Sequence, residues 1–124
     1  MTIRQALDGL AEIQPHSFPE PLLIRWLRQL DAELYENVIL THEGAEAAAA
    51  PGDPSESPDS APLLVPEPYE SIYLHYLQSR IDYALAEYSR FNNSNAMYDA
   101  DRQAFTAWYH RGHMPLAKGV ERFF

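Results

Sequence analysis

Residues 66–115 restrict the fold of this chain more than any other segment. They contain two tyrosine-rich patterns in which apolar residues recur every three or four positions, the period of a helix with one buried face. The polar run at residues 92–95 separates the two patterns, and asparagine and serine favour turns because they bond to the nearby backbone. The segment therefore predicts an antiparallel helical hairpin, with one helix ending near Phe91 and the next running from about Ser94 to His110.

Two further helices are predicted before the hairpin. The first covers residues 3–13, where Thr2 and Gln5 fit a capping box. The second follows the S-x-x-E box at Ser17 and extends toward residues 40–42. Its predicted apolar stripe consists of Leu23, Trp26, Leu27, Leu30, Leu34 and Val38, with Asp31, Glu33 and Glu36 mostly off it. At the end of the hairpin, Gly112 predicts a left-handed helix cap.

Residues 44–62 differ in character from the rest of the chain. They contain four prolines, several acids and no aromatic or basic residue. Such a segment buries too little apolar surface to offset the entropy of ordering it, so it predicts a long disordered loop between the second and third helices. Two roles remain open, a tolerated linker or a segment that orders against a partner. Residues 63–65 then predict an extended segment that docks the loop on the core.

Length and charge set further limits on the whole chain. Its 124 residues predict one all-α domain, with residues 116–124 as a short tail. No stretch approaches about 20 apolar residues, no basic region precedes an apolar run, and cysteine is absent, so we expect a cytoplasmic protein without a membrane span, signal peptide or disulfide. The net charge of -9 argues against nucleic-acid binding through the phosphate backbone.

Candidate catalytic and metal-binding patterns are weak. His110 and His113 lie three positions apart, but spacing suggests no third ligand, and no acid precedes a histidine by three positions as a di-iron bundle requires. The sequence also has no G-x-S-x-G elbow and no glycine-rich phosphate loop. We therefore expect no catalytic residue, no metal site, no cofactor and no enzymatic activity.

Aromatic residues are the best candidates for a functional surface. Tyrosine has an apolar body and a polar tip, which suits half-buried positions and interfaces. Either the tyrosines form the core of a small bundle, or they form a stripe shared between core and subunit interface. The candidate interface residues are Tyr69, Tyr73, Tyr76, Tyr83, Tyr98, Phe123 and Phe124. Two readings stay open for Arg80 and Arg102: a buried ion pair with Asp82 or Asp101, or side chains that extend to the surface or pair there.

Three segments together resemble a known family. They are TIRQALDGLAEI followed by SFPEPLLIRWLRQLDAEL, then LLVPEPYESIYLHYLQSRIDYALAEYSRFNNS, and finally NAMYDADRQAFTAWYHRGHMP. The chain resembles the head–tail connector, or head-completion adaptor, proteins of tailed bacteriophages and prophages. The acidic, proline-rich loop departs from that pattern.

The resemblance implies a structural protein of virion assembly that forms a ring below the portal. DNA passes through the lumen of such a ring without specific binding, and tail-completion or stopper proteins dock beneath it. The implied location is the head–tail junction of the virion, and the host cytoplasm during assembly. An acidic lining would let DNA slide past, because like charges repel. The alternative is a small acidic adaptor or regulatory protein that binds a host protein.

Overall fold

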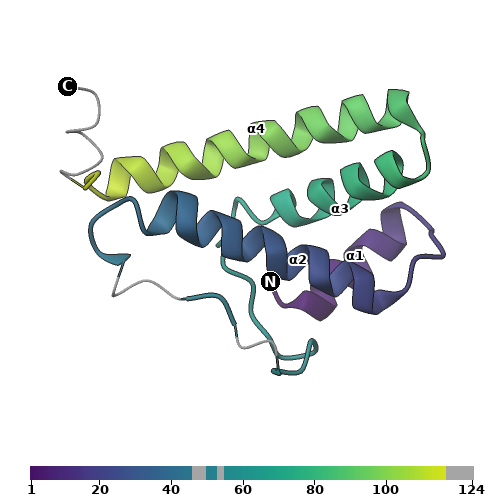
Figure 1. The fold of residues 1–124 in the computed structure, drawn as a ribbon, viewed down its shortest axis with the longest axis horizontal. Helices are drawn as coiled ribbons and strands as arrows, with labels where there is room; N and C mark the ends of the chain where they lie inside the picture. The colour runs from purple at the N-terminus through teal and green to yellow at the C-terminus, as the bar shows by residue number, and fades with distance from the viewer. Residues whose placement is uncertain (46–49, 53–54, 117–124) are drawn as a thin grey trace.

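The computed structural model describes residues 1–45, 50–52 and 55–116, and it confirms an all-α fold with a central antiparallel hairpin (Figure 1). Its elements are α1 (Ile3–Ile13), α2 (Glu20–Leu34), the π-helix η1 (Tyr35–Ile39), α3 (Ser71–Ala84) and α4 (Tyr88–Gly112). The described residues form no strand, and their extended contacts are two isolated bridges, Thr2 with Pro62 and His42 with Pro115.

The two predicted capping boxes have different outcomes. The first is confirmed, because the Thr2 hydroxyl accepts the Gln5 amide hydrogen and the Gln5 side chain accepts that of Thr2. The box at Ser17 is wrong, since α2 begins after Pro19 without a side-chain cap. Phe18 precedes that proline, and a residue in this position avoids helical geometry, so the helix starts later than predicted.

The core forms where α1, α2 and the hairpin meet. Every member of the predicted α2 stripe is buried. The stripe packs against Ile3, Ala6, Leu7 and Leu10 of α1, Ile72, Tyr73, Leu77 and Ile81 of α3, and Phe105 and Tyr109 of α4. Ile13, which continues the α1 periodicity, is instead 55% exposed. α3 therefore lies between α4 on one side and α1 and α2 on the other (Figure 1).

The predicted position of the hairpin turn is wrong. α3 ends at Ala84 and α4 begins at Tyr88, so residues 92–95 lie within α4 rather than in a turn. Ser94 explains the difference, because its hydroxyl donates to the buried carboxylate of Asp82 at 3.0 Å. Asp82 also accepts a hydrogen bond of 3.0 Å from Gln14. Three elements therefore share this carboxylate, and the contact stabilises Ser94 in the helix.

The actual turn depends on Ala86, which has a left-handed φ of 57°. A side chain makes this conformation costly, by about 1–2 kcal/mol, whereas glycine adopts it freely. We expect Ala86→Gly to raise the free energy of unfolding by about 1 kcal/mol, measured by urea denaturation. The matched control is Ala96→Gly on the exposed surface of α4, which should lower it by about 1 kcal/mol. Loss of stability in both variants would contradict this account of the turn.

Residues 57–65 attach the connection between α2 and α3 to the core. The carbonyls of Pro58 and Ala61 accept the amide hydrogens of Arg4 and Ile3, two of the donors that a helix leaves unpaired at its start. The predicted docking of residues 63–65 is confirmed, since Leu63 and Val65 are buried. Residues 46–49 and 53–54 of the predicted loop lie outside the described residues.

The end of α4 also differs from the prediction. The helix ends at Gly112, as expected, but the following residue, His113, is extended with φ -142° and Gly112 has no left-handed φ. The chain then turns back along η1, where the Glu43 amide donates to the Met114 carbonyl at 2.7 Å and the Leu116 amide donates to the Thr41 carbonyl at 3.0 Å. These backbone bonds, rather than a glycine cap, direct the chain away from the helix.

Candidate interaction surfaces

The predicted interface tyrosines occupy very different environments. Tyr73 is fully buried, Tyr69 is partly buried against the core, Tyr76 and Tyr98 are half-buried, and Tyr83 is 61% exposed. Phe123 and Phe124 lie outside the described residues. The tyrosines therefore divide between the core and the surface, and an interface role for those at the surface stays a prediction.

Tyr73 belongs to the core, so the prediction that it is an interface residue is wrong. Its hydroxyl donates to Asp31 at 2.5 Å and accepts the Val65 amide hydrogen at 2.7 Å. The other oxygen of the Asp31 carboxylate accepts the Leu64 amide hydrogen at 3.0 Å. These bonds join α2, α3 and the extended segment between them inside the protein, where no partner reaches Tyr73.

Asp31 was predicted to lie mostly off the apolar stripe, yet only 4% of it is exposed. Burial removes water from the carboxylate and raises its pKa to about 6, although the hydrogen bonds from Tyr73 and Leu64 favour the charged form. Burial likewise raises the pKa of the Tyr73 hydroxyl, and the neighbouring Asp31 charge adds to this effect. Tyr73 therefore remains a hydrogen-bond donor to Asp31.

The exposed tyrosines border an open depression of about 600 Å³ between α2, α3 and α4, here called the aromatic groove. It is lined by Trp26 of α2, by Tyr76, Ser79, Arg80, Tyr83 and Ala84 of α3, and by Phe91, Asn95 and Tyr98 of α4. Three ring contacts cross from α3 to α4: Tyr76 with Tyr98 at 5.2 Å, Tyr83 with Phe91 at 5.3 Å and Tyr83 with Tyr88 at 6.2 Å between centroids. The groove therefore presents aromatic surface from all three helices.

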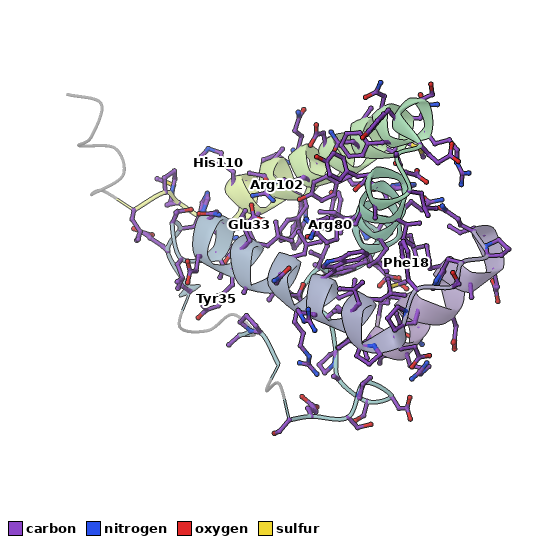
Figure 2. All side chains as sticks on the ribbon, turned by 45° about the vertical axis from the view of Figure 1, so that its right-hand side comes forward. Phe18, Glu33, Tyr35, Arg80, Arg102 and His110 are labelled. Atoms are coloured by element: carbon purple, nitrogen blue, oxygen red, sulfur yellow. The ribbon has the colours of Figure 1, made fainter. Side chains whose placement is uncertain are left out.

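Neither arginine forms the buried ion pair with Asp82 or Asp101, and the surface reading holds for Arg102, whose partner Glu33 is half-exposed. The Arg80 guanidinium lies over the rings of Trp26 and Tyr76, 5.0 and 5.8 Å from their centroids, on the side of α3 that faces α2 (Figure 2). Arg102 pairs with Glu33 of α2 at 2.9 Å and donates to the Tyr98 hydroxyl at 2.9 Å. Arg80 thus supplies the groove with a cation held against aromatic rings.

The two acids predicted as arginine partners have other main contacts. Asp82 is buried and accepts hydrogen bonds from Gln14 and Ser94, with Arg90 3.6 Å away at the surface. Asp101 contacts His75 at 2.5 Å and accepts a hydrogen bond of 3.1 Å from the Ser71 hydroxyl. Both acids therefore connect α4 to α3 rather than form a site open to a ligand.

The histidines near the end of α4 do not converge. His110 contacts His42 of the turn after η1, with 3.2 Å between their ring nitrogens. His113 instead stacks on Tyr109 at 3.8 Å between ring centroids. Within residues 1–45, 50–52 and 55–116, no group of three His, Cys, Asp or Glu side chains is arranged to hold a metal ion.

Sequence reasoning missed two members of the groove. Trp26 was assigned to the core stripe, and its ring is indeed buried, but one side of it forms part of the groove under Arg80. Phe91 was assigned to the end of a helix, whereas it lies in the first turn of α4 opposite Tyr83. The misplaced turn hid this second contact, because it put both rings on one helix.

None of the described helices is long and apolar enough to cross a membrane. No protein-family model, curated protein or solved structure was found to match the chain.

Proposed function

We propose that this chain is a structural connector of phage or prophage virion assembly, which joins a ring of copies below the portal. The proposal starts from the resemblance of its three helical segments to head–tail connector proteins. The observation that carries it is the open aromatic groove, which combines rings from α2, α3 and α4 at the surface. Half-exposed tyrosine rings beside an arginine, with a tryptophan beneath them, are a composition typical of the energetic centre of protein interfaces.

Apolar surface also occurs at the opposite end of the molecule from the α3–α4 turn. Met114 is 67% exposed, Leu40 is 41% exposed and Leu116 is 39% exposed. Met114 and Leu116 follow the C-terminal end of α4, and Leu40 directly follows η1, next to residues 41–43, whose backbone bonds to residues 114 and 116. Tyr83 and Phe91 instead lie at the α3–α4 turn, at the N-terminal end of α4. Two different patches at opposite ends favour head-to-tail contacts between copies, and such contacts form a ring when the rotation closes.

Charge is compatible with a ring around passing DNA. The chain carries a net charge of -9, and Arg4, Arg90 and Arg102 each have an acidic partner within the molecule. A surface with this balance repels the phosphate backbone, so DNA would slide through a lumen lined by it. In this proposal the portal and a tail-completion or stopper protein are the protein partners.

Light scattering on the purified chain, alone and mixed with the portal protein encoded beside it, tests the proposal. We expect a monomer or weak associate alone, and a large discrete complex with the portal. Tyr83→Asp should reduce complex formation, because it places a charge at the rim of the groove, whereas Met97→Asp, at an exposed residue of α4 outside the groove, should reduce it less. A stable twofold dimer without affinity for the portal would contradict the proposal and favour the regulatory alternative.

A further inference from the structure

The aromatic groove has a chemistry that selects its occupant. Its volume of about 600 Å³ lies within the range of roughly 300–1,000 Å³ in which pockets bury a ligand. Tyr83 and Phe91 form its rim, and the rings of Tyr76 and Tyr98 lie deeper. Aromatic rings pack favourably against other rings in offset or edge-to-face geometry. The groove therefore suits a short segment that carries adjacent aromatic side chains.

Residues 117–124 of this same chain have the required composition. Their sequence, AKGVERFF, contains two adjacent phenylalanines, with two basic residues and one acid. The segment thus has a net charge of +1. Because the whole chain has a net charge of -9, the rest of the chain has a net charge of -10. Beside the groove, Glu33 is already paired with Arg102 and Arg80 lies over the rings, so the attraction comes from the overall charge of the body. Opposite charges of this kind favour encounter between the segment and the body of another copy.

The reach of the segment favours binding to a neighbouring copy. From Tyr98, the groove residue nearest the end of α4, to Gly112 the helix rises about 21 Å, and from Phe91 it rises about 32 Å. Eight residues span at most about 26–29 Å when fully extended. The described chain ends at Leu116, which is held to Thr41 at the end of the molecule away from the groove. A segment that doubled back along its own copy would therefore reach Tyr98 only when nearly extended, and it would not reach Phe91 at the rim of the groove.

We propose that residues 117–124 of one copy bind in the aromatic groove of a neighbouring copy, with Phe123 and Phe124 packed against its rings. The contact joins two different patches, so it repeats head to tail. This proposal names the contact between subunits of the proposed connector. It rests on the connector function only for the closure of the repeated contact into a ring. In a subunit bound at both ends, the groove holds the segment of one neighbour while the subunit's own segment occupies the groove of the next.

A peptide of residues 114–124 tests this contact without any portal. Fluorescence anisotropy would follow binding of the labelled peptide to the full chain carrying Phe123→Ala and Phe124→Ala, whose own segment no longer competes. We expect saturable binding, and a loss of about tenfold or more when both phenylalanines of the peptide are replaced by alanine. Tyr83→Ala in the receptor should weaken binding about tenfold, whereas Met97→Ala should change it less than about twofold. Met97 is the control, because it is 50% exposed on α4 and does not line the groove.

Three results would overturn the inference. The first is the absence of saturable binding. The second is an equal loss from Tyr83→Ala and Met97→Ala, which would indicate a general hydrophobic surface. The third is that the peptide binds the chain carrying Phe123→Ala and Phe124→Ala but not the wild-type chain, at concentrations where the wild-type chain is monomeric. The groove of the wild-type chain would then be occupied by its own segment. Recruitment to the portal without peptide binding would support the connector function and exclude this contact. Peptide binding without recruitment to the portal would support this contact and contradict the connector function.

Discussion

Replacement of Phe105 by alanine is expected to cause the largest loss of stability of any single change considered for this protein, about 3–5 kcal/mol. Phe105 is 1% exposed, and α4 has only two other buried residues, Ser94 and Tyr109. Its ring packs near Tyr69, 6.5 Å away between centroids, and near Tyr109 at 6.2 Å. The substitution removes most of the apolar anchor of α4 and leaves a cavity, so the transfer and cavity costs add.

Urea denaturation followed by circular dichroism measures this loss. Trp108→Ala is the matched control in the next turn of α4, because Trp108 is 37% exposed and loses less buried surface. It should cost about 1–2 kcal/mol. Since a domain of this size has a total stability of about 5–15 kcal/mol, Phe105→Ala should leave the chain close to unfolding at 37 °C. Equal losses in the two variants would show that α4 does not depend on Phe105 as its anchor.

The second large effect concerns pH and the buried carboxylate of Asp31. Burial raises the pKa of this group from its ordinary value of 3.8 to about 6, so the folded chain holds the proton more tightly than the unfolded chain. Protonation of Asp31 therefore adds to the free energy of unfolding. This contribution is fully present below the ordinary pKa and is lost as the pH rises through about 6. Between pH 4.5 and 7.5 we expect Asp31 to lower the free energy of unfolding by about 2 kcal/mol.

Other groups titrate over the same range, so the measurement compares variants. Urea denaturation of wild type and Asp31→Asn at several pH values isolates the group, because asparagine keeps the shape of the side chain but does not titrate. The free energy of unfolding of wild type should fall relative to Asp31→Asn by about 2 kcal/mol between pH 4.5 and 7.5. Glu36→Gln, at an exposed acid of η1, should leave the wild-type pH profile unchanged. Parallel profiles for wild type and Asp31→Asn would contradict the raised pKa.

The same two regions show where sequence reasoning succeeded and where it failed. The α2 stripe was predicted residue by residue, because the period of a helix fixes which positions share a face. The same period made Asp31 look peripheral, since a charged side chain is seldom buried without partners. Its partners are Tyr73 and the amide of Leu64, which are distant in sequence. Only folding brings them to the carboxylate and makes its burial tolerable.

The hairpin turn illustrates a second limit. Asparagine-rich residues 92–95 carry the stronger local turn signal, yet the chain reverses at Ala86 with an unfavourable φ of 57°. The observed turn lies about seven residues before the predicted one, which corresponds to nearly two turns of a helix. A helix that begins two turns earlier still has its apolar residues on the same face. Periodicity therefore cannot distinguish the two positions. The hydrogen bond from Ser94 to Asp82, together with the Gln14 contact, favours the observed one.

The sequence by itself determined the helical class, the N-terminal capping box, the apolar faces of α1 and α2, and the docking of residues 63–65. These features follow from interactions between residues a few positions apart, or from the apolar character of a short run. Only the tertiary structure decided which tyrosine is core and which is surface, where the hairpin turns, and that Trp26 and Phe91 meet the tyrosines in one groove. These outcomes depend on side chains from α2, α3 and α4 competing for the same space and the same hydrogen bonds, and no local pattern encodes that competition.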